Sequence, residues 1–180
     1  DMVVHKNFKI KLGLWKNKNL YNLYKKAKTP YSWHADAFKL ANKKNIILFS
    51  TPFSEKAVNF LEQFNPPLYK VASFEITDLN LINKIAKTKK PIIISTGLSN
   101  INEVKSAIKV IKKHHNKIII LHCVSGYPTP IDEINLKRIS YLKDKLSTNL
   151  IGLSDHTNGI EAASTASVLG IVAIEKHFIL

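Results

Sequence analysis

The sequence predicts an α/β protein whose parallel sheet forms part of a (β/α)8 barrel, and three observations lead to this fold class. Short apolar runs of strand character recur along the chain, separated by helix-like stretches. Polar side chains collect where those runs end. Six runs are present, two fewer than a closed eight-stranded barrel requires. We therefore expect residues 1–180 to form one partial barrel domain.

The apolar runs give the predicted strands, which span residues 46–50, 68–73, 91–96, 117–123, 150–154 and 171–178. Helices are predicted between them at 54–64, 101–113, 135–145 and 160–169. Ser54 is a suitable N-cap for the first of these, and apolar residues recur at helical spacing behind it. Before the first long strand we expect a short strand at 9–14 and helices at 20–26 and about 30–44. Strands that alternate with helices at this spacing form parallel sheets.

An open doubly wound sheet and a closed barrel share this alternation, and the polar residues favour the barrel. They lie at or just beyond the carboxyl ends of several strands: Thr51, Ser73, Glu75, Ser95, Thr96, Ser125, Tyr127, His156, Glu175 and His177. Barrel enzymes build their sites at this end of the sheet, from many strands at once.

Composition excludes several classes of function. The formal net charge is +14, yet the lysines are spread along the chain and Arg138 is the one arginine, which is poor provision for nucleic-acid contacts. No apolar run is long enough to cross a membrane, and no signal peptide is recognisable. The single cysteine, Cys123, excludes an internal disulfide and fits the cytoplasm. His122 and Cys123 lie in an apolar strand, and we expect both to be buried structural residues.

Two strands near the carboxyl end of the chain each finish in a histidine. Side chains alternate along a strand, so Ser154 shares a face with His156, and Glu175 shares one with His177. The helix predicted between them makes the strands parallel and near neighbours, which brings two imidazoles and a carboxylate together. Such groups suit a divalent transition metal. The alternative is two unrelated histidines, one capping a helix and one packed in the core.

Six ordered motifs resemble the sialic acid synthase family. They are F-S-T-P-F-S (49–54), Y-K-V-A-S-F-E (69–75), P-I-I-I-S-T-G (91–97), L-H-C-V-S-G-Y-P-T-P (121–130), I-G-L-S-D-H-T (151–157) and I-E-K-H-F (174–178). The resemblance implies a (β/α)8 barrel enzyme that condenses phosphoenolpyruvate with an amino sugar. It also implies that this chain holds barrel strands three to eight, without the first two strands and the antifreeze-like domain that follows the barrel. Members of the family form homodimers.

Within the family, residues 13–34 are most similar to pseudaminic acid synthases, as is V-A-S-F-E-I-T-D at 71–78. The implied sugar is then 2,4-diacetamido-2,4,6-trideoxy-altrose. Two alternatives stay open: a synthase of N-acetylneuraminate or legionaminate, and a non-catalytic remnant or sugar-binding pseudoenzyme. The second gains weight from the missing strands and from Ile179, which stands where the family usually has a threonine.

The resemblance also implies roles for residues that match the family motifs. His156 and His177 match the ligands of a divalent metal, expected to be Mn²⁺. Glu175, Glu75 and Lys70 are the candidate catalytic residues. Phosphoenolpyruvate is expected to contact a set of polar side chains, namely Thr51, Lys70, Ser73, Ser95, Ser125 and Tyr127. By simple alternation Lys70 faces away from Ser73 and Glu75, so it needs a bulge or its long stem to reach the same site.

Overall fold

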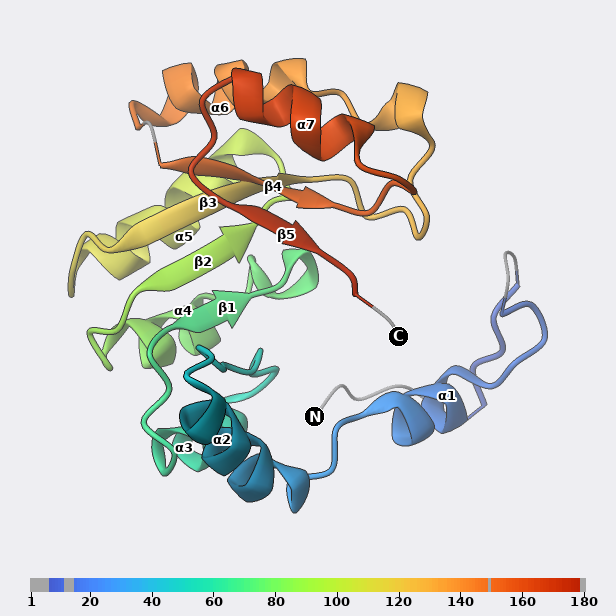
Figure 1. The fold of residues 1–180 in the computed structure, drawn as a ribbon, viewed down its shortest axis with the longest axis vertical. Coiled ribbons are helices and arrows are strands. Elements are labelled where there is room, and N and C mark those ends of the chain that lie inside the picture. The colour runs from blue at the N-terminus through green and yellow to red at the C-terminus, as the bar shows by residue number, and fades with distance from the viewer. Residues whose placement is uncertain (1–6, 12–14, 149, 179–180) are drawn as a thin grey trace.

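The computed structural model describes residues 7–11, 15–148 and 150–178, and it contains a curled, five-stranded parallel sheet. The strands are β1 (Tyr69–Val71), β2 (Ile92–Ser95), β3 (Ile118–Cys123), β4 (Ile151–Asp155) and β5 (Ile174–Lys176). Each strand pairs with the next along the chain, so their order in the sheet is β1-β2-β3-β4-β5 (Figure 1). Sequential parallel strands with a steady curl are the arrangement of a half-barrel, which confirms the predicted fold class.

Helices connect the strands and precede them. They are α1 (Leu20–Ala27), α2 (Trp33–Lys44), α3 (Glu55–Glu62), α4 (Leu79–Ala86), α5 (Ile101–Lys112), α6 (Lys137–Leu146) and α7 (Glu161–Val168). Single 3-10 turns lie at Ser73–Glu75 and Ile131–Glu133. Side chains of Ser54, Asp78 and Asn100 accept hydrogen bonds from the first backbone N–H groups of α3, α4 and α5, which explains where these helices begin. Among the described helices, none is long and apolar enough to cross a membrane.

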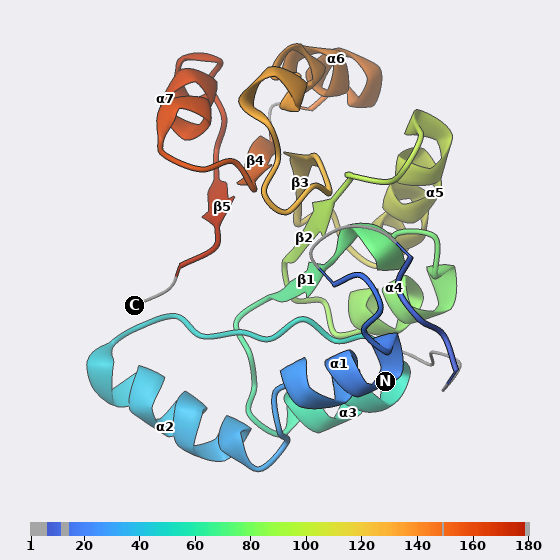
Figure 2. The ribbon, with the colours of Figure 1, turned by 90° about the vertical axis from the view of Figure 1, so that its right-hand side faces the viewer.

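The two faces of the sheet differ in chemistry. Helices α4 to α7 cover the outer face (Figures 1 and 2), where the core side chains of the strands, such as Ile94, Ile120 and Leu153, are fully or almost fully buried. The inner face instead carries polar side chains towards the carboxyl ends of the strands, including Lys70 and Ser154. The apolar core therefore lies outside the curl, and the carboxyl end of the inner face is left for polar chemistry.

Five of the six predicted strands are confirmed, but the one at 46–50 is wrong. That segment joins no ladder in the described structure, and Ile46 and Ile47 are 62% and 73% exposed. A buried parallel strand needs covered faces and a neighbour that pairs with it, and the described residues leave both isoleucines largely exposed and unpaired. The helix α4 was not predicted, although Asp78 caps it and its buried residues Leu81, Ile82 and Ile85 recur at helical spacing. The short strand expected at 9–14 is one antiparallel bridge, Lys9 with Asn19, and residues 12–14 lie outside the described residues.

Candidate active site

Lys70 extends from β1 across the inner face and contacts residues of two other strands. Its Nζ donates a hydrogen bond to Ser95 Oγ on β2 at 2.8 Å and lies 3.3 Å from Glu175 Oε2 on β5. Ser154 on β4 donates to the other carboxylate oxygen of Glu175 at 2.6 Å. One ammonium, one carboxylate and two hydroxyls from four strands therefore form a continuous network. Lys70 is 6% exposed, so its charge acts in a largely water-free setting.

The predicted conflict between Lys70 and its neighbours does not arise. Strand β1 ends at Val71, and the 3-10 turn Ser73–Glu75 follows at once, so strict alternation stops before Ser73. Lys70 points inward from the strand, and the turn brings Ser73 back to the same side, where its Oγ meets Cys123 Sγ at 3.7 Å. The long stem of Lys70 carries its ammonium to Ser95 and Glu175, which is one of the two routes expected from alternation.

Side chains from two loops converge on Gly97, just beyond the end of β2. The backbone N–H of Gly97 donates to Ser73 Oγ at 3.0 Å. A Cβ atom at this position would lie 2.4 Å from Ser125 Oγ and 3.0 Å from both Cys123 Sγ and Ser73 Oγ. Ser125 Oγ is buried without a hydrogen-bond partner in the described part of the chain, which suits a hydroxyl that binds a substrate. Gly97 was missed in the sequence, although a glycine after a strand often marks such a close approach.

In the complete protein, Gly97→Ala is expected to lower the kcat/KM of any reaction at this site by about 10- to 100-fold, because displacement of catalytic groups by an ångström has effects of this size. Gly97 is not among the positive-φ glycines, so the added methyl acts through the hydroxyls and not through backbone strain. Gly126→Ala is the matched control, since its Cβ would approach no atom closer than 3.3 Å. Steady-state kinetics checks this prediction, and equal effects of the two variants would contradict it.

The two histidines lie together at the ends of β4 and β5, as predicted. Their ring centroids are 5.2 Å apart, and the Tyr127 ring lies 4.2 Å from His156 and 5.6 Å from His177. His156 Nδ1 lies 2.9 Å from the Val124 carbonyl oxygen, which can only accept, so this nitrogen carries the proton. The Nε2 lone pair of His156 is thereby left for a ligand, and Ser154 Oγ lies 3.5 Å from this nitrogen.

Cys123 is buried as predicted, but it belongs to the site. Its Sγ lies 3.8 Å from His156 Nδ1. Burial raises the pKa of the Cys123 thiol, but the hydrogen bonds with His156 and Ser73 outweigh burial and bring the pKa below its usual value. Burial in turn lowers the pKa of His156, while the contacts with Cys123 and the Val124 carbonyl outweigh it and raise the pKa. Cys123 contacts His156 because it faces inward on β3, whereas its neighbour His122 faces outward.

The donor set fits a divalent metal only in part. The described residues hold no group of three or more His, Cys, Asp or Glu side chains that could bind one ion. Glu175 lies on the predicted face, but its oxygens are engaged by Lys70 and Ser154. Two imidazoles, one with its tautomer set by the Val124 carbonyl, leave the other coordination positions to water or substrate oxygens, as in catalytic sites that keep open positions.

The remaining predicted residues divide between this site and its surroundings. Glu75 is partly buried, and its Oε2 has no hydrogen-bond partner in the described structure. Burial raises the pKa of the Glu75 carboxyl, and the charge of Lys70 opposes that shift. Thr51 lies elsewhere, in a pocket of about 690 Å³ between the start of α2 and α3, and none of the other nine predicted residues lines that pocket.

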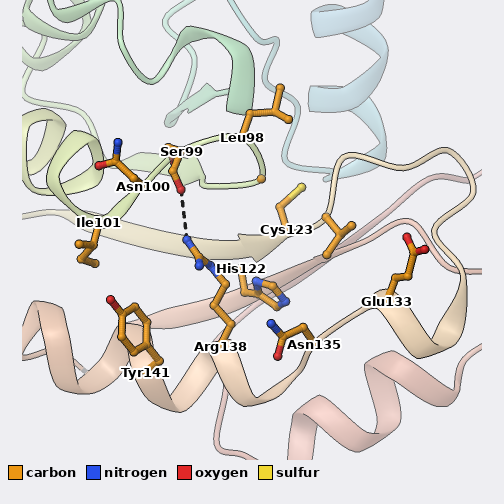
Figure 3. Close-up of a pocket in the computed structure, with 12 residues that line it drawn as sticks. Leu98, Ser99, Asn100, Ile101, His122, Cys123, Glu133, Asn135, Arg138 and Tyr141 are labelled. Carbon is orange, nitrogen blue, oxygen red and sulfur yellow. Dashed lines mark hydrogen bonds between the residues drawn. The ribbon is translucent and has the colours of Figure 1, made fainter.

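A second pocket, of about 550 Å³, lies beside the site on the outer side of the sheet (Figure 3). Arg138 from α6 donates to the Ser99 carbonyl at 3.1 Å across this pocket. His122 Nε2 donates to the Ile134 carbonyl at 2.7 Å, which confirms the expected buried structural histidine. Burial is the main reason that the pKa of His122 lies below its usual value. None of the ten predicted site residues, all of them described, lines this pocket.

The sheet and its polar network define a barrel-type α/β domain, with a candidate active site built from five strands and their loops at the carboxyl end of the sheet. A protein-family model identifies the family within this class of barrel-type domains. The model of the NeuB family matches residues 2–180, and the chain belongs to this family.

Known proteins similar to this chain point in the same direction. A pseudaminic acid synthase of Campylobacter jejuni (strain 81-176) is 46% identical over 175 residues, which are 97% of this chain and 51% of that protein. An N,N'-diacetyllegionaminic acid synthase of Campylobacter jejuni is 42% identical over 150 residues, covering 82% and 45%. The crystal structure of an N-acetylneuraminic acid synthetase of Leptospira borgpetersenii superposes with a TM-score of 0.79 at 33% identity, covering 86% and 54%. The chain thus spans about half the length of the curated relatives it matches.

Proposed function

We propose that the protein containing this chain is a pseudaminic acid synthase, which condenses phosphoenolpyruvate with 2,4-diacetamido-2,4,6-trideoxy-altrose and releases phosphate. One observation carries the proposal: a buried lysine, a ring of serine hydroxyls and two neighbouring imidazoles meet at the carboxyl end of one sheet. Phosphoenolpyruvate is a multiply charged anion, and a buried ammonium with hydroxyl donors is the setting that recognises such a group. The similarity to pseudaminic acid synthases supports the choice of sugar.

The residues of this chain have distinct tasks in the proposed reaction. Lys70, with Ser73, Ser95 and Ser125, binds the phosphate and carboxylate of phosphoenolpyruvate, while Tyr127 covers the site next to the imidazoles. Carbon 3 of phosphoenolpyruvate supplies the electron pair for a bond to the sugar aldehyde carbon, and the aldehyde oxygen takes up a proton. Water then adds at carbon 2 and loses a proton. The resulting tetrahedral centre expels phosphate and leaves the keto acid.

His156 and His177 would hold a divalent metal, expected to be Mn²⁺, which supplies Lewis-acid polarisation of the sugar aldehyde when bound. Glu175 and Glu75 are assigned to the sugar hydroxyls and the attacking water. Burial raises the pKa of Glu75, which makes its carboxyl a better proton acceptor near neutral pH than an exposed glutamate. Thr51 keeps its proposed role only if the Thr51 pocket opens towards Lys70 in the complete protein.

The working protein is proposed to be a cytoplasmic homodimer that acts on small molecules and binds neither nucleic acid nor membrane. The single buried cysteine agrees with a reducing compartment.

Phosphate release tests the proposed function directly. The protein expressed from its complete reading frame is incubated with manganese and phosphoenolpyruvate, and offered the altrose sugar or N-acetylmannosamine in separate reactions, with a sugar-free control. Release with the altrose sugar alone is expected. Release with N-acetylmannosamine alone would replace pseudaminate by N-acetylneuraminate and keep the mechanism. Silence with both sugars, followed by release with a legionaminate precursor, would make it a legionaminate synthase, and silence with all three would favour a pseudoenzyme.

A further inference from the structure

Behind the two imidazoles, a compact ionic cluster joins the same two strands. Asp155 immediately precedes His156, and Lys176 immediately precedes His177. Asp155 and Lys176 are register partners in the last described rung of the β4–β5 ladder. Lys176 Nζ lies 2.6 Å from Asp155 Oδ2. It also donates to the carbonyl oxygen of Thr157 at 2.9 Å.

The residues before and after His156 in the sequence, Asp155 and Thr157, are hydrogen-bonded to each other. Asp155 Oδ1 accepts hydrogen bonds from the backbone N–H of Thr157 at 2.9 Å and from its hydroxyl at 2.7 Å. His156 is thus held between two residues that are bonded to each other, and Lys176 ties both to β5. Asp155 is completely buried, and these contacts bring the pKa of its carboxyl below the usual value even though burial alone would raise it.

A buried carboxylate with three donors resists rearrangement, because separating it from its cation leaves an uncompensated charge. The relative position of β4 and β5 at this rung is therefore fixed more firmly than backbone pairing alone would fix it. Side chains alternate along both strands, so the cluster lies on the outer face while His156 and His177 follow on the inner face.

We propose that Asp155, Thr157 and Lys176 are positioning residues that set the spacing of the two imidazoles for one divalent cation. This inference rests on the metal assignment in the proposed function. Two nitrogens that bind the same ion must each lie about 2 Å from it. A shift between the two strand ends therefore weakens the site even when both histidines are present.

The test is calorimetric titration with Mn²⁺ of the protein from its complete reading frame, with thermal unfolding measured in parallel. Lys176→Met removes the ammonium and keeps the apolar stem. Lys176 is substituted because its side chain is the more exposed member of the ion pair with Asp155. Its Kd for Mn²⁺ is expected to rise about 10- to 100-fold, the range found when groups that orient metal ligands are lost. Lys176→Arg, which can still reach Asp155, is expected to recover most of the affinity.

Lys90→Met is the matched control. Lys90 forms an ion pair of similar length, 2.7 Å, with Glu62, and it precedes β2 at the opposite end of the sheet. This variant is expected to lose stability without any change in the Kd for Mn²⁺. If Lys176→Met loses stability but binds Mn²⁺ as the unsubstituted protein does, the positioning role is refuted alone. If the unsubstituted protein binds no Mn²⁺, the metal assignment falls and the positioning role falls with it.

Discussion

Replacing His156 with alanine in the complete protein is expected to reduce manganese-dependent phosphate release to background. His156 presents Nε2 to the site because its Nδ1 is held by the Val124 carbonyl, so the substitution removes an oriented ligand and leaves one imidazole. The Kd for Mn²⁺ is expected to rise by more than about 100-fold, because losing a ligand exceeds the roughly 10- to 100-fold effect of losing a group that orients it. Titration calorimetry and phosphate release against Mn²⁺ concentration measure the two effects.

His115→Ala serves as the control for His156→Ala. His115 lies in the loop before β3, at the amino end of the sheet and so far from the site. Its replacement is expected to change neither Mn²⁺ affinity nor turnover. Unchanged manganese dependence in His156→Ala would remove the metal role of this histidine, whatever happened to His177.

The inner-face site illustrates what strand alternation can predict. Alternation placed Ser154 with His156 and Glu175 with His177, and in the structure Ser154 Oγ lies 3.5 Å from His156 Nε2 and the two imidazoles lie side by side. The partners of Glu175 were not predictable in this way, because Lys70 reaches it across the curl from a strand at the other edge of the sheet. A pattern within one strand carries no information on how far the sheet curls. Cys123 lies beside His156 for a different reason, because the register of the neighbouring strands β3 and β4 pairs Cys123 with Ser154.

Segments at the edges of the sheet were harder to predict than those in the middle. Residues 46–50 have the apolar composition of a strand. Such residues form a strand only where a neighbouring strand pairs with them and buries their side chains. Thr51 follows that segment and was expected beside Lys70. Because residues 46–50 do not pair with β1, Thr51 instead lines a pocket that Lys70 does not line. Ile179, whose missing hydroxyl bears on the pseudoenzyme alternative, lies outside the described residues. The central strands were easier to predict, because each of them pairs with the strands that precede and follow it in the sequence.

Lys70→Met in the complete protein is expected to lower the kcat/KM for phosphoenolpyruvate by about 10- to 150-fold. Hydrogen bonds to charged groups contribute about 1.5–3 kcal/mol, and each 1.4 kcal/mol corresponds to a factor of ten. Methionine keeps the length and apolar stem of lysine, so the buried path across the inner face stays filled. Mn²⁺ affinity should be unchanged, since no contact of Lys70 with either imidazole is seen in the described residues.

This prediction separates two roles that Lys70 can have, because its ammonium also neutralises Glu175. If it acts on the substrate, Lys70→Met weakens phosphoenolpyruvate binding measured without sugar, and the midpoint of thermal unfolding changes little. If it serves only to balance Glu175, phosphoenolpyruvate binds normally and turnover falls through the displaced carboxylate. Lys105→Met, on the exposed face of α5, is the control for loss of one positive charge. Normal binding of phosphoenolpyruvate to Lys70→Met would contradict the substrate role, because a buried ammonium removed from an anion site must reduce affinity for the anion.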